Sequence, residues 1–165
     1  MITQKGNKKM YNPITTDGKT SVVMWDYRPI LDEKGNETNR GKWQLEKLSG
    51  DISLDRIKDV ILGYYNNKID EKIVSGMEWK GMKVWLSSEN QFNYKAAYDL
   101  AVQTNGLNLP VIFKFGDNNN PQYYEFKDVA ELTDFYFASM KHIQQTLEEG
   151  WALKDSIDWT IYQVN

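Results

Sequence analysis

A strand pair followed by a helix occurs twice in succession between residues 72 and 159, and this pattern limits the folds open to the chain. The segment GMEWKGMKVWL (residues 76–86) predicts a tight hairpin, and residues 88–104 predict a helix. Residues 109–126 predict a second hairpin, and residues 128–157 predict a longer helix. The pattern predicts an α+β fold in which antiparallel β-hairpins alternate with α-helices and the helices pack on one face of the sheet.

The first of these hairpins has the clearest register. A two-residue Lys80-Gly81 turn is typical of a hairpin, and it predicts the cross-strand pairs Trp79 with Met82, Glu78 with Lys83, and Met77 with Val84. The same register places Trp85 opposite Gly76, on the face turned away from the core. We expect that ring to be covered either by the N-terminal segment or by another chain.

Three helix starts are marked by capping residues. Ser53 is a predicted N-cap, and Ser88 and Asp128 each open a capping box that Gln91 and Glu131 complete. The apolar spacing in the second of these helices predicts that it buries Phe92, Ala96, Ala97, Leu100 and Ala101.

The sequence predicts three segments. Residues 1–20 are polar, rich in glycine, asparagine and lysine and without an apolar period, which predicts a flexible N-terminal arm. Residues 21–50 predict an N-terminal β-hairpin around a polar loop, and residues 51–165 predict the α+β domain. At the end of that domain, residues 159–164 alternate in the manner of a strand.

Aromatic residues are unusually frequent, with six Trp, ten Tyr and six Phe. One interpretation is an ordinary core in which rings replace aliphatic side chains. The other is that some rings lie at protein interfaces, where Trp and Tyr are enriched. Under this second interpretation the candidate protein-interaction residues are Trp25, Tyr27, Trp43, Trp85, Trp159 and Tyr162.

The composition argues against most kinds of catalytic, cofactor and metal site. The chain has no cysteine and one histidine, His142, so we predict no catalytic residues, no cofactor and no metal site. A glycosidase-like carboxylate pair would draw on Glu78, Asp99, Glu125 or Glu131, but Lys83 and helix capping explain the first and last of these better. The oxygen-rich loops at 32–37 and 117–120 lack the EF-hand spacing and are predicted to be solvated turns.

The charge and hydropathy limit the partners. A net charge of −3 and a pI near 5.2 argue against a nucleic-acid binder, although the lysines at 5, 8 and 9 lie in the predicted arm. No apolar run is long enough to span a membrane, and the polar N-terminus predicts no secretion signal.

Three segments carry a family resemblance: VWLSSENQFNY (84–94), LPVIFKF (109–115) and EGWALKDSI (149–157). Over about residues 60–159 the chain resembles a phage- and prophage-encoded domain of unknown function that is often attached to tail or tail-fibre proteins, in the version found in phages of gut Bacteroidales. The resemblance implies a setting in the virion, and in the host cytoplasm during assembly, but it carries no catalytic residue.

We therefore expect a non-enzymatic structural or adaptor protein of a bacteriophage tail, collar or fibre-attachment region. Its partners would be other phage structural proteins and further copies of itself, in a homo-oligomer or ring. Two alternatives stay open at this point. One is a tail-fibre assembly chaperone that is absent from the mature virion, and the other is a glycan-binding module that stacks sugars on surface Trp and Tyr rings.

Overall fold

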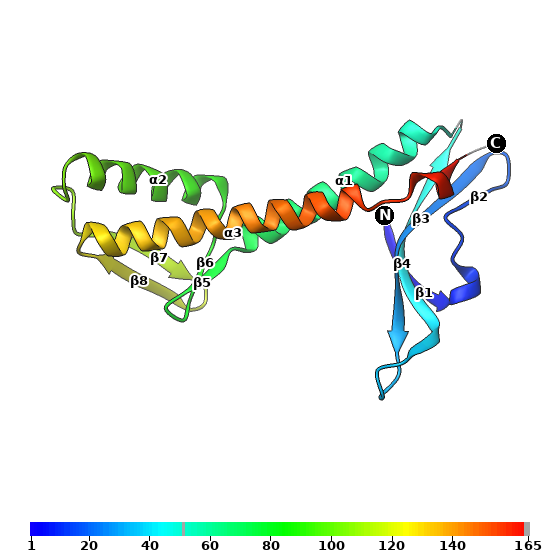
Figure 1. The fold of residues 1–165 in the computed structure, drawn as a ribbon, viewed down its shortest axis with the longest axis horizontal. Coiled ribbons are helices and arrows are strands. Elements are labelled where there is room, and N and C mark those ends of the chain that lie inside the picture. Colours follow the sequence, from blue (N-terminus) through cyan, green and yellow to red (C-terminus); the bar gives the residue numbers. More distant parts are fainter. Residues whose placement is uncertain (51, 164–165) are drawn as a thin grey trace. The chain divides into compact units, whose positions relative to one another are not determined.

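A computed structural model describes residues 1–50 and 52–163, and the chain divides into two compact units (Figure 1). Unit 1 consists of Met1–Tyr64 together with the segment from Ser156 onward, and unit 2 is Tyr65–Asp155. Both units combine helices with antiparallel strands. The predicted α+β class and the alternation of hairpins and helices are confirmed, with the strands distributed over three separate sheets.

Unit 1 is built on a four-stranded antiparallel sheet with the order β1-β4-β3-β2. Its central strands, β3 (Thr20–Leu31) and β4 (Glu37–Ser49), form the hairpin predicted for residues 21–50. The outer strands are β1 (Ile2–Asn7), which pairs with β4, and β2 (Ile14–Thr16), which pairs with β3. The two N-terminal strands therefore lie on opposite edges of the same sheet.

The prediction of a flexible arm over residues 1–20 is wrong, because this segment is part of the sheet. To pass from one edge to the other, the chain crosses the sheet through the short helix η1 (Lys8–Met10). Tyr11 follows, and its ring lies 5.1 Å from the ring of Tyr27 and 5.9 Å from that of Trp43. A polar edge strand needs few apolar residues of its own, since backbone hydrogen bonds to a neighbouring strand hold it.

A bulge in β3 distributes the aromatic side chains of unit 1 over both faces of the sheet. Residues 25 and 27 of a regular strand would share a face, but the register shifts between Trp25 and Arg28, where Asp26 has a φ of 54°. Trp25 packs edge-on against Tyr64, with 5.6 Å between ring centroids. Tyr27 instead stacks on Trp43 at 6.3 Å.

Helix α1 (Leu54–Ser75) contributes its first half to unit 1 and its second half to unit 2. The predicted cap is confirmed, because the Arg56 amide donates a hydrogen bond of 3.3 Å to the Ser53 hydroxyl. Ile57 and Ile61 are fully buried. The helix continues through Gly63 and the two asparagines at 66 and 67, since each weak helix former costs at most about 1 kcal/mol and the rest of a long helix outweighs it.

The end of the chain is helical where the sequence predicts a strand. Residues Trp159–Tyr162 form the short 3-10 helix η2, capped by Asp158, whose carboxylate accepts a hydrogen bond of 2.9 Å from the Thr160 amide. The Tyr162 hydroxyl donates a hydrogen bond of 3.0 Å to the Met24 carbonyl. Residue 164, the last of the predicted strand, lies outside the described residues.

Unit 2 contains two hairpins and two further helices. The first hairpin is β5 (Met77–Trp79) with β6 (Met82–Val84), and its register is the predicted one. Lys80 and Gly81 have φ values of 49° and 77°, as a type I′ turn requires. Helix α2 (Ser88–Gln103), the hairpin of β7 (Val111–Gly116) and β8 (Pro121–Phe126), and helix α3 (Val129–Asp155) complete the unit.

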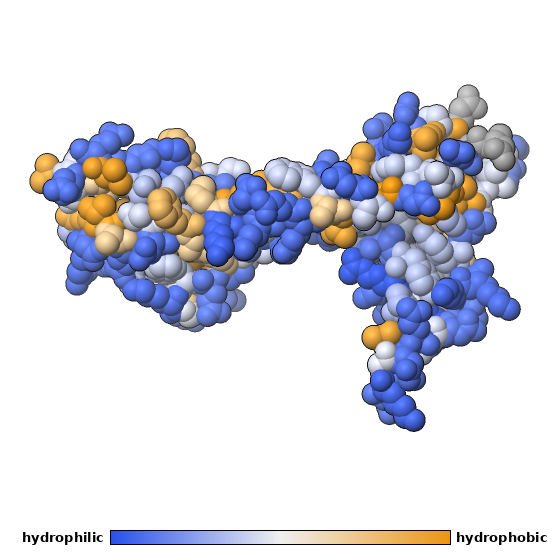
Figure 2. All heavy atoms as spheres, in the orientation of Figure 1, coloured by the Kyte–Doolittle hydropathy of each residue, from blue (hydrophilic) through white to orange (hydrophobic). Residues whose placement is uncertain are grey.

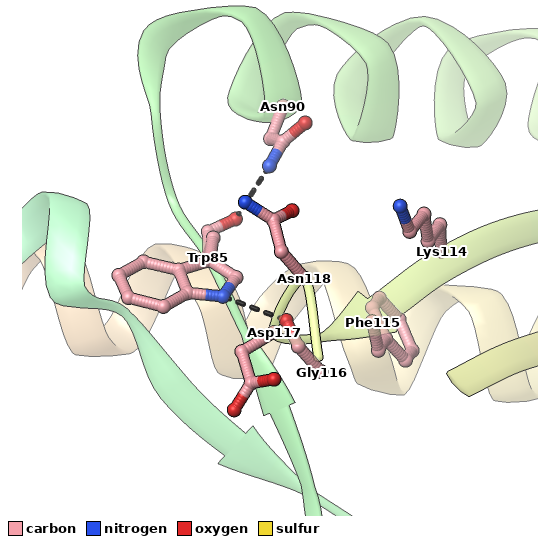
Figure 3. A pocket seen from close by; sticks show the side chains of 7 residues that line it. All are labelled: Trp85, Asn90, Lys114, Phe115, Gly116, Asp117 and Asn118. Atoms are coloured by element: carbon pink, nitrogen blue, oxygen red, sulfur yellow. Dashed lines mark hydrogen bonds between the residues drawn. The ribbon is translucent and has the colours of Figure 1, made fainter. Parts of the chain in front are cut away.

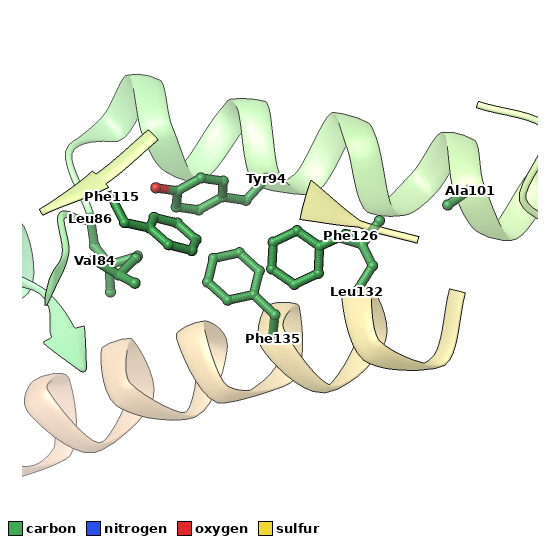
Figure 4. Close-up of a cluster of buried hydrophobic side chains, with 8 residues drawn as sticks. All are labelled: Val84, Leu86, Tyr94, Ala101, Phe115, Phe126, Leu132 and Phe135. Atoms are coloured by element: carbon green, nitrogen blue, oxygen red, sulfur yellow. The ribbon is translucent and has the colours of Figure 1, made fainter. Parts of the chain in front are cut away.

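Aromatic rings form the core of unit 2 (Figure 4). Phe135 of α3 is fully buried, with its ring 5.0 Å from those of Tyr94 and Phe126 and 5.4 Å from that of Phe115. Burial raises the pKa of Tyr94 to about 12. The other buried members of the cluster are Val84, Leu86, Ala101 and Leu132.

Helix α2 begins at the predicted residue, but its N-cap and part of its buried face differ from the prediction. The N-cap is Ser87, not Ser88, and its hydroxyl accepts a hydrogen bond of 3.3 Å from the Asn90 amide. Tyr94 is buried, whereas Phe92 is 70% exposed and Leu100 is 48% exposed. Aromatic contacts set this orientation, including a Tyr98–Tyr136 stack at 4.5 Å that joins α2 to α3. Of the five residues predicted to be buried, Ala101 is fully buried and Ala97 is partly buried against the core, as predicted, whereas Phe92, Ala96 and Leu100 are exposed.

Helix α3 is continuous from Val129 to Asp155 and does not break at Gly150. Gly150 is buried because the second half of α1 packs closely on it. A Cβ atom at Gly150 would lie 2.2 Å from Cδ1 and 2.4 Å from Cγ1 of Ile69. By contrast, a Cβ atom at Gly63 of α1 would meet nothing within 4 Å.

These two helical glycines form a matched pair for a stability test. We expect Gly63→Ala to raise the free energy of unfolding by up to about 1 kcal/mol, because alanine favours the helix. Gly150→Ala should lower it by about 1 kcal/mol or more, because overpacking costs about 1–3 kcal/mol. Urea denaturation of the full-length chain measures both values. Equal stabilisation by the two variants would contradict the close α1–α3 packing. In the double variant, Ile69→Ala should restore part of the stability that Gly150→Ala loses, because it removes the side chain that the new Cβ would meet.

A charged cluster joins the first hairpin of unit 2 to β8 and to the start of α3. The Lys80 ammonium donates a hydrogen bond of 2.7 Å to the Tyr124 hydroxyl, and both groups donate to the Glu131 carboxylate. Hydrogen bonds from Lys80 and Tyr124 hold the pKa of Glu131 below its usual value, and the bond to Glu131 raises the pKa of Lys80. The predicted capping box is thus half formed. Asp128 caps the Glu131 amide at 2.8 Å, while the Glu131 side chain turns to Lys80.

The cluster predicts a pH dependence. Because the pKa of Glu131 is lower in the folded state than its ordinary 4.5, its stabilisation is present above about pH 4.5 and is lost as the pH falls through the folded value. We expect Glu131→Gln to lower the free energy of unfolding at pH 7 and to approach the parent protein once the pH has fallen below the lowered pKa of Glu131. The matched control is Glu125→Gln, which loses only a surface pair with Lys127 at 3.2 Å and should change little. Equal effects of the two variants at pH 7 would contradict the role of the cluster.

Candidate functional site

The candidate site of unit 2 is a pocket beside Trp85, the residue that follows β6 (Figure 3). The indole N–H of Trp85 donates a hydrogen bond of 2.7 Å to the carbonyl of Gly116, the last residue of β7. This bond fixes the ring between the two hairpins and satisfies its one polar atom. The residue nevertheless remains 40% exposed, so the surface that the ring offers is apolar.

Polar side chains from three elements line the same pocket. Asn90, in the first turn of α2, donates a hydrogen bond of 3.1 Å from its side-chain nitrogen to the Trp85 carbonyl. Asp117 and Asn118 come from the loop between β7 and β8, and Lys114 comes from the outward side of β7. Backbone amides of residues 119 and 120 donate to one Asp117 oxygen at 2.9 Å and 2.8 Å, which keeps the loop folded.

The pocket has a volume of about 340 Å³ and a lining of balanced charge. Lys114 and Asp117 contribute one charge of each sign, and the remaining side chains are neutral. Phe115, which is 1% exposed, also lines the pocket and joins it to the aromatic core. Outside the lining, the Lys83 ammonium lies 5.2 Å from the centre of a Trp85 ring.

The six predicted interaction residues are divided between the two units. Trp85 belongs to unit 2, and the other five belong to unit 1. Trp25, Trp43 and Tyr162 are at most 2% exposed, so they are core residues and cannot serve as surface contacts in this fold. Tyr27 and Trp159 are half-buried. The three buried rings thus follow the first of the two interpretations, in which aromatic residues replace aliphatic ones in a core, and an interface role for Tyr27 and Trp159 stays a prediction.

A second surface feature is absent from the sequence predictions, because three residues of α2 that were predicted to be buried are exposed. Phe92, Ala96 and Leu100 recur every four residues and are all exposed, so they form one apolar row, the α2 outer stripe. In Figure 2, orange apolar residues interrupt the hydrophilic surface in the part of unit 2 that contains α2. Tyr123, on the outward side of β8, is also 69% exposed.

The carboxylates and the histidine considered above for catalysis take part in ordinary structural contacts. Three of the four carboxylates that could form a glycosidase pair have lysine partners: Asp99 with Lys95, Glu125 with Lys127, and Glu131 with Lys80. Glu78 lies opposite Lys83 in the first hairpin. His142 lies on α3, and its carbonyl accepts a hydrogen bond of 2.9 Å from the Thr146 hydroxyl. Within residues 1–50 and 52–163, no three His, Asp or Glu side chains lie close enough together to hold a metal ion.

Comparisons with known proteins give a family but no function. Among the helices that the structure describes, none has both the length and the apolar character needed to cross a bilayer. No curated protein and no solved structure matches the chain significantly. Residues 56–165 match the family described as Domain of unknown function (DUF4376). This match covers two thirds of the chain, including all of unit 2, and the chain therefore belongs to the DUF4376 family.

Proposed function

We propose that this chain is a non-enzymatic structural or adaptor protein of a bacteriophage virion, in the tail, collar or fibre-attachment region. It acts in several copies through protein–protein contacts, and it is present in the host cytoplasm during assembly. The single observation that carries the contact role is the α2 outer stripe. Its three apolar residues lie on the solvent side of a helix whose other side is packed into the core.

The stripe has the form of a helix-pairing surface. Single exposed apolar residues are common, but a row at helical spacing is typical of a face that meets another helix. Ala96 lies at its centre, where a small side chain allows two backbones to approach, and Phe92 and Leu100 lie one turn to either side. In an antiparallel pair of two copies, Phe92 of each chain would meet Leu100 of the other, so the stripe is complementary to itself. The occupant that fits it is a second copy of this chain.

The viral setting rests on a different observation, the sequence resemblance over residues 60–159. Family membership itself carries no function. The exposed apolar stripe supports the assembly role, because a protein that works in several copies needs a surface that pairs with itself. The setting and the assembly role therefore require separate tests.

The first test concerns the oligomeric state. We expect the full-length protein to self-associate and Phe92→Glu to reduce this association at least about tenfold, because the change places a carboxylate in an apolar interface. Light scattering after size-exclusion chromatography measures the mass of each species. The matched control is Tyr123→Glu, an equally exposed aromatic residue of unit 2 on β8, which should leave the mass unchanged. A monomeric parent protein, or dissociation by the control alone, would contradict the assignment to α2.

The second test concerns the virion. We expect proteomics of purified particles from the encoding phage to detect this chain at several copies per particle, in a fixed ratio to the portal protein. A protein that is abundant in infected cells but missing from the particle would overturn the structural role.

A further inference from the structure

We propose that the pocket beside Trp85 binds an uncharged carbohydrate, with a pyranose ring stacked on the indole. The proposal is independent of the self-association assigned to α2, because none of the residues that line the pocket belongs to the α2 outer stripe.

The indole meets the first requirement for such a ligand, a fixed apolar platform. Its N–H is already bonded to Gly116 at 2.7 Å, so the ring cannot turn freely and needs no polar partner from a ligand. The residue remains 40% exposed, and with its N–H engaged the ring can offer a ligand only aromatic carbon, beside the Lys83 ammonium at 5.2 Å from a ring centre. A pyranose presents C–H groups on its faces, and these match an aromatic surface, while its hydroxyl groups project around the rim.

The surrounding side chains meet the second requirement, hydrogen-bonding groups at the edge of the platform. Asn118 offers an amide, which can both donate and accept, and Lys114 offers an ammonium donor. Asp117 uses one carboxylate oxygen for its own loop, and its other oxygen remains as an acceptor. Mixed donors and acceptors in a small space suit hydroxyl groups, each of which donates one bond and accepts others.

Charge and size narrow the ligand class. One lysine and one aspartate leave the lining itself without net charge, which suits an uncharged ligand, and the Lys83 ammonium lies outside the lining, 5.2 Å from a Trp85 ring centre. The volume of about 340 Å³ lies near the lower end of the range of about 300–1,000 Å³ for ligand pockets, which suits one or two sugar rings.

Saturation-transfer-difference NMR on the full-length protein tests the proposal. The probes are the methyl glycosides of glucose, galactose, mannose, rhamnose and N-acetylglucosamine, with N-acetylneuraminic acid as the charged member. We expect at least one neutral glycoside to bind at millimolar concentration, with the strongest transfer to the C–H protons of one ring face.

Two variants and one control locate the binding. Trp85→Ala and Asn118→Ala should each weaken binding about tenfold. The second variant keeps the test valid if the first disturbs folding, because Asn118 is an exposed loop residue outside the aromatic core. Trp151→Ala removes another tryptophan, 46% exposed on α3 and outside the pocket, and should leave binding unchanged.

Three results would overturn the assignment: no transfer to any neutral glycoside, binding of the acidic sugar alone, or neutral binding that survives in both pocket variants. Measuring self-association on the same samples distinguishes a failure of the carbohydrate proposal from a failure of the pairing proposed for the α2 outer stripe.

Discussion

The packing of Phe135 against rings from β5, α2, β7 and β8 is the interaction on which unit 2 depends. Its ring contacts Trp79 of β5 at 5.5 Å, Tyr94 of α2 at 5.0 Å and Phe126 of β8 at 5.0 Å. A two-stranded hairpin is at best marginally stable in water by itself, and unit 2 contains two of them. Aromatic pairs contribute about 0.5–1.5 kcal/mol each beyond the area that they bury. One phenylalanine of α3 therefore holds together elements that could not persist separately.

The same packing explains the orientation of α2. Tyr94 can enter the core because its hydroxyl reaches the edge of the cluster and lies 3.5 Å from the Trp85 carbonyl, while its ring meets Phe113 at 4.7 Å. With Tyr94 turned inward, Phe92 must turn outward, since residues two positions apart lie on different sides of a helix. The exposed stripe is thus a geometrical consequence of how the core is filled.

Features encoded by neighbouring residues could be predicted from the sequence, and features set by distant partners could not. The Lys80-Gly81 turn and the caps at Ser53 and Asp128 depend on the local backbone, and all three were predicted correctly. The N-terminal strands were missed because their order comes from pairing with β4 and β3. Trp85 was recognised as a surface ring, but its neighbours Asp117 and Asn118 lie more than 30 positions away in the sequence, where no local signal identifies them.

Two surfaces of unit 2 originate in one helix. The first turn of α2 supplies Asn90 to the pocket, and the following three turns present the α2 outer stripe. Both positions follow from the rotation of α2 about its axis, which Tyr94 and its contact with Phe135 determine. A change in that core contact would therefore alter both surfaces together, whereas a change at Asn118 or Phe92 alters one. A variant that loses both ligand binding and self-association therefore indicates a change in the core. A variant that loses only one of the two identifies the pocket or the α2 outer stripe as the surface responsible.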